Sequence, residues 1–213
     1  VFDVLEHALK KGIKLDMVLN TQHLMGQEIL NTIRRVQEHL DISRITALSK
    51  YAGLIKDAFP QIPLICSYNE GVKTSKKLEE VHSLGYFDYI VFSNAAIRNF
   101  KLFAQAHRLG LKVKFLVNNG CSFACMAFCH PSDGCLPIFE RTLESRGDVN
   151  ILYAEQSILP WEFHKYYVGC PTIDSFKISC RPSSYKWLFN CLRSYILNIN
   201  EEVIYYSKDH YHY

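Results

Sequence analysis

Short apolar runs alternate with amphipathic stretches along most of this chain, and this alternation constrains the fold more than any other feature. The apolar runs predict strands at residues 14–19, 45–48, 63–66, 89–92, 112–117, 151–153 and 176–179. Helical spacing of apolar residues predicts helices at residues 2–11, 27–40, 51–59, 76–84, 95–109, 160–167 and 184–198. Strands that alternate with helices of this length indicate βαβ units and a parallel sheet.

Repeated βαβ units in one chain favour a (β/α)₈ barrel over an open doubly wound sheet. No G-x-G-x-x-G phosphate loop follows any predicted strand, which disfavours a nucleotide-binding fold. We therefore predict an α/β protein with a TIM-barrel-like parallel barrel at residues 1–198 and an irregular tail at residues 199–213. The strands fall short of eight and the helix at 2–11 lacks a preceding strand, so we expect a barrel that is incomplete at the N-terminus.

The composition narrows the class of protein. With 48% hydrophobic and 21% charged residues, the chain matches a globular domain and not a disordered one. The net charge of +3 is too small to indicate nucleic-acid or membrane affinity by itself. No apolar run approaches the ~18 residues of a membrane span, and no signal segment opens the sequence. We expect a cytoplasmic protein with no membrane span and no DNA partner.

Half of the eight cysteines lie close together directly after the predicted strand 112–117. Loops that follow barrel strands build active sites. Thiolates favour iron–sulfur clusters or zinc, and clustered cysteines without a secretion signal indicate metal or redox chemistry. We therefore predict a metal site formed by Cys121, Cys125, Cys135 and Cys129.

The spacing of these cysteines distinguishes between several kinds of metal site. Three residues separate Cys121 from Cys125, and three separate Cys125 from Cys129. This differs from the C-x₂-C pair of structural zinc, and its second gap is one residue longer than in the radical SAM motif. The gaps from Cys121 to Cys125 to Cys135 suit a cluster held by a loop.

The alternative interpretation of a cysteine is a small buried apolar side chain. We expect this for Cys66 and Cys191, which have apolar neighbours in the sequence. Cys170 and Cys180 are intermediate, because either one lies near a predicted strand end and is able to complete a metal site. His130 is a further candidate ligand, although a histidine beside a proline on a loop is more often solvated.

Four polar residues near predicted strand ends are candidates for substrate binding. Arg181 and Lys177 would clamp an anionic group, with surface ion pairs as the alternative. Asn118 and Asn20 would orient substrate or cap turns. The sequence contains neither G-x-S-x-G nor H-E-x-x-H, so it offers no recognisable hydrolytic machinery.

Three phrases of the sequence resemble the collagenase-like peptidase family U32. They are VNNGC at residues 117–121 followed by Cys125, ILPWEFHKY at residues 158–166, and FKISCR at residues 176–181. An early Leu-Asn at residues 19–20 also fits. Cys180 stands where the family has glycine, Met126 where proline is frequent, and Cys129 is additional.

The resemblance implies a TIM-barrel-like scaffold that carries a four-cysteine [4Fe-4S] cluster. Cys121 and Cys125 match best, Cys135 is favoured as the third ligand, and the fourth stays open between Cys129, Cys170 and Cys180. Family members include oxygen-independent hydroxylases of ubiquinone synthesis and enzymes that hydroxylate RNA, besides the founding collagen-degrading peptidases.

We therefore expect a redox enzyme that hydroxylates a small molecule or RNA, with a partner subunit of the same family as a further possibility. The alternatives are a peptide hydrolase of the U32 type and a non-enzymatic domain in which the cysteines bind structural zinc.

Overall fold

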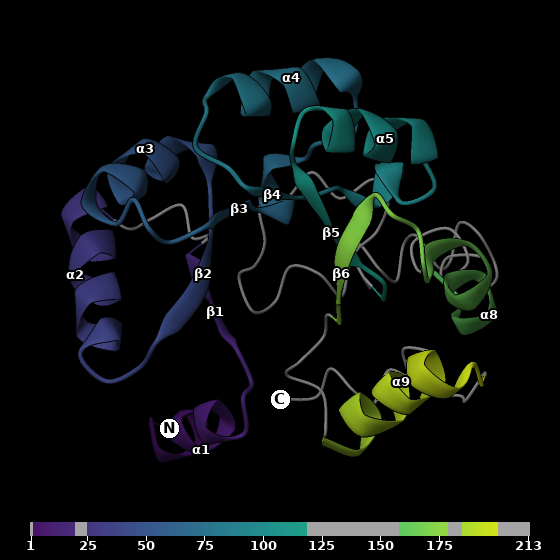
Figure 1. Cartoon of the computed structure of the whole chain (residues 1–213), viewed down its shortest axis with the longest axis horizontal. Coiled ribbons are helices and arrows are strands. Elements are labelled where there is room, and N and C mark those ends of the chain that lie inside the picture. The colour runs from purple at the N-terminus through teal and green to yellow at the C-terminus, as the bar shows by residue number, and fades with distance from the viewer. Residues whose placement is uncertain (1, 20–24, 119–157, 179–184, 200–213) are drawn as a thin grey trace, which may run out of the picture. The chain divides into compact units, whose positions relative to one another are not determined.

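The computed structural model describes residues 2–19, 25–118, 158–178 and 185–199 (Figure 1). The chain divides into two compact units. The first unit comprises Val1–Ser93 and Ala104–Val113, and the second comprises Asn94–Phe103 and Lys114–Tyr213.

Parallel strands in chain order form the sheet of the first unit. They are β1 (Leu15–Leu19), β2 (Ile42–Ala47), β3 (Leu64–Cys66), β4 (Tyr89–Val91) and the beginning of β5 (Lys112–Leu116). The pairs β1–β2, β2–β3 and β3–β4 are parallel, with Met17 opposite Ile45 and Ile45 opposite Leu64. A helix connects each strand to the next, which confirms the predicted α/β class and its parallel sheet.

Helices α2 (Gly26–Gln37) and α3 (Ser49–Ala58) cover the first strands and lie side by side (Figure 1). Ile29 and Ile33 of α2, Ile45 of β2 and Ile55 of α3 are all fully buried in one core cluster. Each such side chain contributes about 1.5–3 kcal/mol through burial of apolar surface. The apolar residues that recur at helical spacing in the sequence of α2 are therefore the ones that pack on the sheet.

Helices α1 (Phe2–Lys10) and α4 (Ser75–Ser83) of the first unit begin and end close to their predicted positions, and the short 3₁₀ helix η1 (Tyr68–Glu70) was not predicted. The Thr74 hydroxyl accepts a hydrogen bond from Lys77 N and caps α4, and Gly85, with a φ of 71°, ends it.

The second unit contains the end of β5 beside β6 (Ile173–Lys177), together with α8 (Pro160–Glu162), the π-helix η3 (Phe163–Tyr167) and α9 (Tyr185–Leu197). Its core is aromatic. The ring of Phe115 lies 4.9 Å from that of Phe103 and 5.4 Å from that of Tyr167, in edge-to-face and tilted arrangements.

Several elements differ in extent from their predictions. Helix α2 ends at Gln37 and not at residue 40. Helix α5 (Phe100–Arg108) begins later than residue 95 because Asn99 Oδ1 accepts from Leu102 N and caps it, while Asn94–Ala96 form the 3₁₀ helix η2. Strand β2 begins at Ile42, which pairs with Leu15 of β1. Strand β6 lies nearer the N-terminus than residues 176–179, since polar Asp174 and Ser175 conceal the beginning of the strand in the sequence.

Within the described parts of the chain, no helix combines the length and apolar character that crossing a membrane would require.

Candidate functional site

The residues that flank the cysteine-rich segment (residues 119–157) lie close together in the second unit. Val117 follows β5, and the described chain resumes at Ile158, whose main-chain N–H donates to Val117 O over 2.8 Å. Val117 N in turn donates to the main-chain oxygen of Lys177 at the end of β6, over 3.0 Å. The predicted ligands Cys121, Cys125, Cys129 and Cys135 belong to the interval between them and lie outside the described residues.

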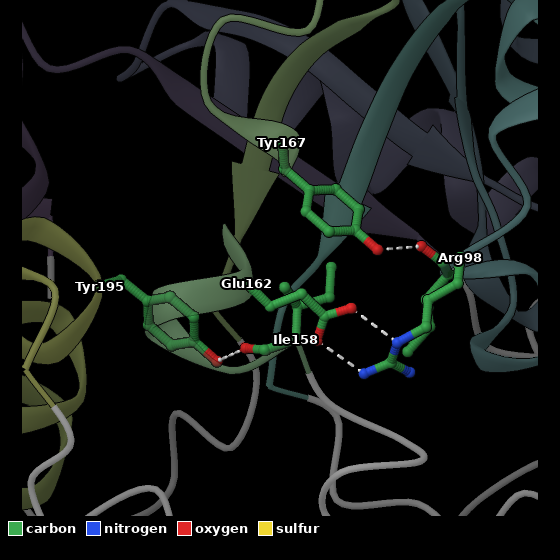
Figure 2. Close-up of polar contacts among 6 residues, drawn as sticks. Arg98, Ile158, Glu162, Tyr167 and Tyr195 are labelled. Atoms are coloured by element: carbon green, nitrogen blue, oxygen red, sulfur yellow. Dashed lines mark hydrogen bonds and ion pairs between the residues drawn. The ribbon is translucent and has the colours of Figure 1, made fainter. Parts of the chain in front are cut away.

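Tyr195 of α9 holds these two ends together. Its buried hydroxyl donates to Ile158 O over 2.7 Å (Figure 2). The same hydroxyl lies 3.2 Å from Val117 O, its second acceptor. Burial, and after it the neighbouring Cys191 and Glu162, raises the pKa of Tyr195 well above its ordinary value. The hydroxyl therefore stays a hydrogen-bond donor throughout the physiological range. We call Val117, Asn118, Ile158 and Tyr195 the stem.

Asn118 is the last described residue before the cysteine-rich segment, and its side chain is only 6% exposed. Its amide Nδ2 donates to the Sγ atom of Cys191 in α9 over 3.3 Å. Asn118 was predicted to orient substrate or cap a turn. In the structure it links the end of β5 to α9, beside the contact made by Tyr195.

Arg98 and Glu162 form a two-pronged ion pair close to the stem (Figure 2). Arg98 Nε lies 2.7 Å from Oε1, and Nη2 lies 2.8 Å from Oε2. The Glu162 side chain is 10% exposed and that of Arg98 is 38% exposed. A carboxylate so far out of water requires a charged, hydrogen-bonded partner, and the planar guanidinium supplies both. Glu162 lies in the ILPWEFHKY phrase, at the beginning of the predicted helix 160–167.

A second contact from the same helical segment reaches the residue beside Arg98. The hydroxyl of buried Tyr167 donates to Ile97 O over 2.8 Å (Figure 2). Burial is the main cause that raises the pKa of Tyr167, and Glu162 adds to it. Glu162 and Tyr167 are joined through the π-helix η3, whose wider turn brings residues five apart toward one side. Single π-turns of this kind are frequent at functional sites.

His164 connects η3 to α9. Its Nε2 atom lies 2.5 Å from Tyr195 O, and since a carbonyl oxygen only accepts, Nε2 carries the proton. The ring of Phe163 also packs edge-on against the ring of Tyr195, with centroids 5.5 Å apart. Tyr195, whose hydroxyl contacts Val117 and Ile158, is thus itself held in position by η3.

The other predicted site residues have different positions. Lys177 is the last residue of β6 and half-buried, and its main chain contacts the stem. Cys170 is half-buried, with Sγ 3.2 Å from Thr172 Oγ1. Asn20, Cys180 and Arg181 lie outside the described residues, so the predicted gathering of Asn20, Cys121 and Arg181 at one rim remains a prediction.

Cys66 and Cys191 are both fully buried, which confirms their predicted packing role. Burial raises the pKa of the Cys66 thiol, so that side chain stays a neutral thiol. In the ranges that the structure describes, no group of three or more His, Cys, Asp or Glu side chains is arranged to bind a metal ion.

Sequence reasoning missed Arg98, His164 and Tyr195. Each of these residues contacts a partner that is remote in the sequence, and no periodic pattern within one helix or strand predicts a contact of that kind. One usable signal was Glu162 itself, a carboxylate among aromatic and apolar neighbours, which indicates a buried acid that needs a cation.

No family model matches this chain, and no curated protein matches it. The function therefore has to be inferred from the stem and from the donor chemistry of the segment that it borders.

Proposed function

We propose that this chain is a protein of the U32 type with an incomplete TIM-like barrel, and that its cysteine-rich segment binds a [4Fe-4S] cluster. Its activity would be a redox modification, hydroxylation, of a small molecule or RNA. The observation that carries the proposal is the stem. Val117 and Ile158, which flank a segment with four clustered cysteines, are joined by a hydrogen bond and held by Tyr195.

Fixed segment ends matter for a metal site because the entropy of bringing loop ends together then does not oppose ligand binding. The stem follows β5, and the loops after strands are where β/α proteins place their reacting groups. Within the stem, Tyr195 and Asn118 make their contacts from buried positions, and half-buried His164 contacts Tyr195 from outside it. This arrangement favours a functional segment over an unconstrained surface loop.

The donor set fits the proposed group. Four thiols in one short segment are soft ligands, and soft thiolate sites select iron–sulfur clusters or zinc. Cys121, Cys125 and Cys135 would bind the cluster together with Cys129, Cys170 or Cys180. When bound, a [4Fe-4S] cluster supplies one-electron chemistry.

Lys177 and Arg181 are the proposed substrate clamp. Lys177 ends β6, and its main-chain oxygen accepts from Val117 N, so its backbone lies next to the stem. Arg181 would follow it in the chain and provide a planar cation for an anionic group such as phosphate or carboxylate.

The experiment is anaerobic purification of the full chain, followed by a visible absorbance spectrum and by iron, sulfide and zinc assays. A brown protein with equal amounts of iron and acid-labile sulfide supports the cluster. Colourless protein with stoichiometric zinc would favour the structural alternative. Protein with neither metal, after reconstitution with iron and sulfide, would contradict both.

A further inference from the structure

The helical segment at residues 160–167 contacts one place in the second unit from both of its ends. Near its beginning, the Glu162 carboxylate binds Arg98 through both oxygens, at 2.7 and 2.8 Å. At its end, the hydroxyl of Tyr167 donates over 2.8 Å to the main-chain oxygen of Ile97, the residue before Arg98 (Figure 2). Two side chains that are five positions apart therefore reach adjacent residues.

The π register of η3 makes both of these contacts possible. Val168 N donates over 3.0 Å to Phe163 O, five residues back, which is the hydrogen bond of a π-helix. In an α-helix, with about 3.6 residues per turn, side chains five positions apart point about 140° away from each other. An α-helical turn would therefore keep the contact of Glu162 or that of Tyr167, and not both.

The same turn also contacts α9. The ring of Phe163 packs against the ring of Tyr195, with centroids 5.5 Å apart, and His164 Nε2 donates to Tyr195 O. The Tyr195 hydroxyl in turn donates to Ile158 O of the stem over 2.7 Å. Because His164 lies inside the π-turn, a change of register would rotate its ring away from Tyr195.

A π-turn depends on contacts from outside the helix. Such turns are rare because the tighter α-helical hydrogen bond is the usual arrangement of the same backbone. The Arg98–Glu162 pair supplies this support, since it is bidentate and charge-assisted and the Glu162 side chain is only 10% exposed. Without the pair, one of the two ends of the turn loses its main contact.

We propose that η3 is a conformational relay between the Arg98–Glu162 pair and the stem. The pair keeps the turn in its π register, and this register holds Phe163 and His164 against Tyr195. Tyr195 then holds the residues that flank the cysteine-rich segment. When the pair is broken, the turn tightens toward an α-helix and the stem opens more often. The relay does not depend on what the cysteine-rich segment binds, and so it is independent of the proposed function.

Hydrogen exchange of the Ile158 amide measures the opening of the stem, because Ile158 N donates to Val117 O. In the full chain, Arg98→Met should accelerate this exchange at least about tenfold, which corresponds to about 1.4 kcal/mol of opening free energy. The proton on His164 Nε2, which Tyr195 O protects from solvent, should lose its downfield signal in the same variant. Both quantities are measured by NMR spectroscopy.

Two further variants distinguish a relay from an ion pair that only stabilises the fold. Leu102→Ala leaves a cavity at a buried position of the same unit, and this destabilised control should keep the His164 signal. The double variant Arg98→Met/Glu162→Leu should recover most of the lost stability, because no isolated charge remains. Exchange at Ile158 should nevertheless stay fast in the double variant, because the ion pair that holds the π register is absent.

Three results would overturn the proposal. The first is exchange at Ile158 that is no faster in Arg98→Met than in Leu102→Ala, and the second is a His164 signal that persists in Arg98→Met. The third is a double variant in which exchange at Ile158 returns to the wild-type rate, which would limit the pair to a stabilising role. Circular dichroism checks the folding of each variant, and the double variant decides the question even where Arg98→Met fails to fold.

Discussion

The Tyr195 hydroxyl lies 2.7 Å from the main-chain oxygen of Ile158, and so a side chain of α9 holds the residue at which the chain returns from its cysteine-rich segment. The same hydroxyl is 3.2 Å from Val117 O, at the point of departure. A change at this one atom should therefore affect both stability and metal retention.

Removal of this hydroxyl is the first prediction. Tyr195→Phe removes the hydroxyl that donates to the buried main-chain oxygen of Ile158, whereas Val117 O keeps Ile158 N as its donor; the loss should cost about 1–3 kcal/mol of unfolding free energy. It should also lower the iron content after identical reconstitution, because the ends of the segment are less constrained. Urea unfolding and iron assays measure the two effects. Tyr185→Phe, at an exposed position, is the control and should change neither; iron content equal to wild type in Tyr195→Phe would argue against the role of the stem.

The Arg98–Glu162 pair gives the second prediction. Arg98→Met leaves the Glu162 carboxylate largely out of water without its cation, and should cost about 3 kcal/mol of unfolding free energy. The double variant Arg98→Met/Glu162→Leu should recover most of that loss, since no isolated charge remains. As control, Lys77→Ala removes the exposed Lys77–Glu80 pair and should cost at most about 0.5 kcal/mol. An Arg98→Met loss no larger than that of the control would contradict the stabilising role of the Arg98–Glu162 pair.

The third prediction concerns alkaline pH. Burial raises the pKa values of Tyr167 and Tyr195 above the ordinary tyrosine value of about 10, so the folded protein keeps protons that the unfolded chain releases. Their contribution to stability is complete below about pH 10 and falls as the pH rises further. The slope should reach about 1.4 kcal/mol per pH unit for each tyrosine.

Urea unfolding between pH 9 and 11, monitored by circular dichroism, measures this slope. Tyr195→Phe should make the slope shallower. Cys66→Ala should remove a separate loss of stability that begins near the ordinary thiol pKa of about 8.5, because burial also raises the pKa of that thiol. An identical slope in Tyr195→Phe and wild type would show that the tyrosine does not titrate as described.

Ligand replacement tests the metal site. Cys121→Ser and Cys125→Ala should lose the bound metal, because thiolates supply most of a cluster's binding. Cys66→Ala removes a buried thiol remote in sequence from the segment and should keep full metal content, with a modest loss of stability. Equal metal content in Cys125→Ala and wild type would exclude that cysteine as a ligand.

The last prediction separates a redox enzyme from a peptidase. Protein with a complete cluster should not cleave denatured collagen or casein, because the sequence offers neither an activated nucleophile nor a zinc-protease motif. Under the same anaerobic conditions, Arg181→Ala should keep the cluster and lose activity on the true substrate. Metal-dependent peptide cleavage that disappears in Cys121→Ala would favour the alternative function, a peptide hydrolase of the U32 type.

The sequence by itself determined the order of helices and strands and, in α2, the face that packs on the sheet. Ile29 and Ile33 recur at helical spacing, and both are fully buried where α2 covers the sheet. Cys66 lies in an apolar run and is fully buried in β3. These features are predictable because the periodicity of a segment follows from its own backbone geometry and reports which side of the element meets the core.

Only the tertiary structure decided which remote groups meet at the stem. Tyr195 and Ile158 are 37 positions apart, and Arg98 and Glu162 are 64 apart. The sequence places Tyr195 in the predicted helix 184–198 but does not indicate which carbonyl oxygen its hydroxyl reaches. That choice depends on where β5, η3 and α9 pack, and the packing is fixed by the summed contacts of all three elements and not by any local run of residues.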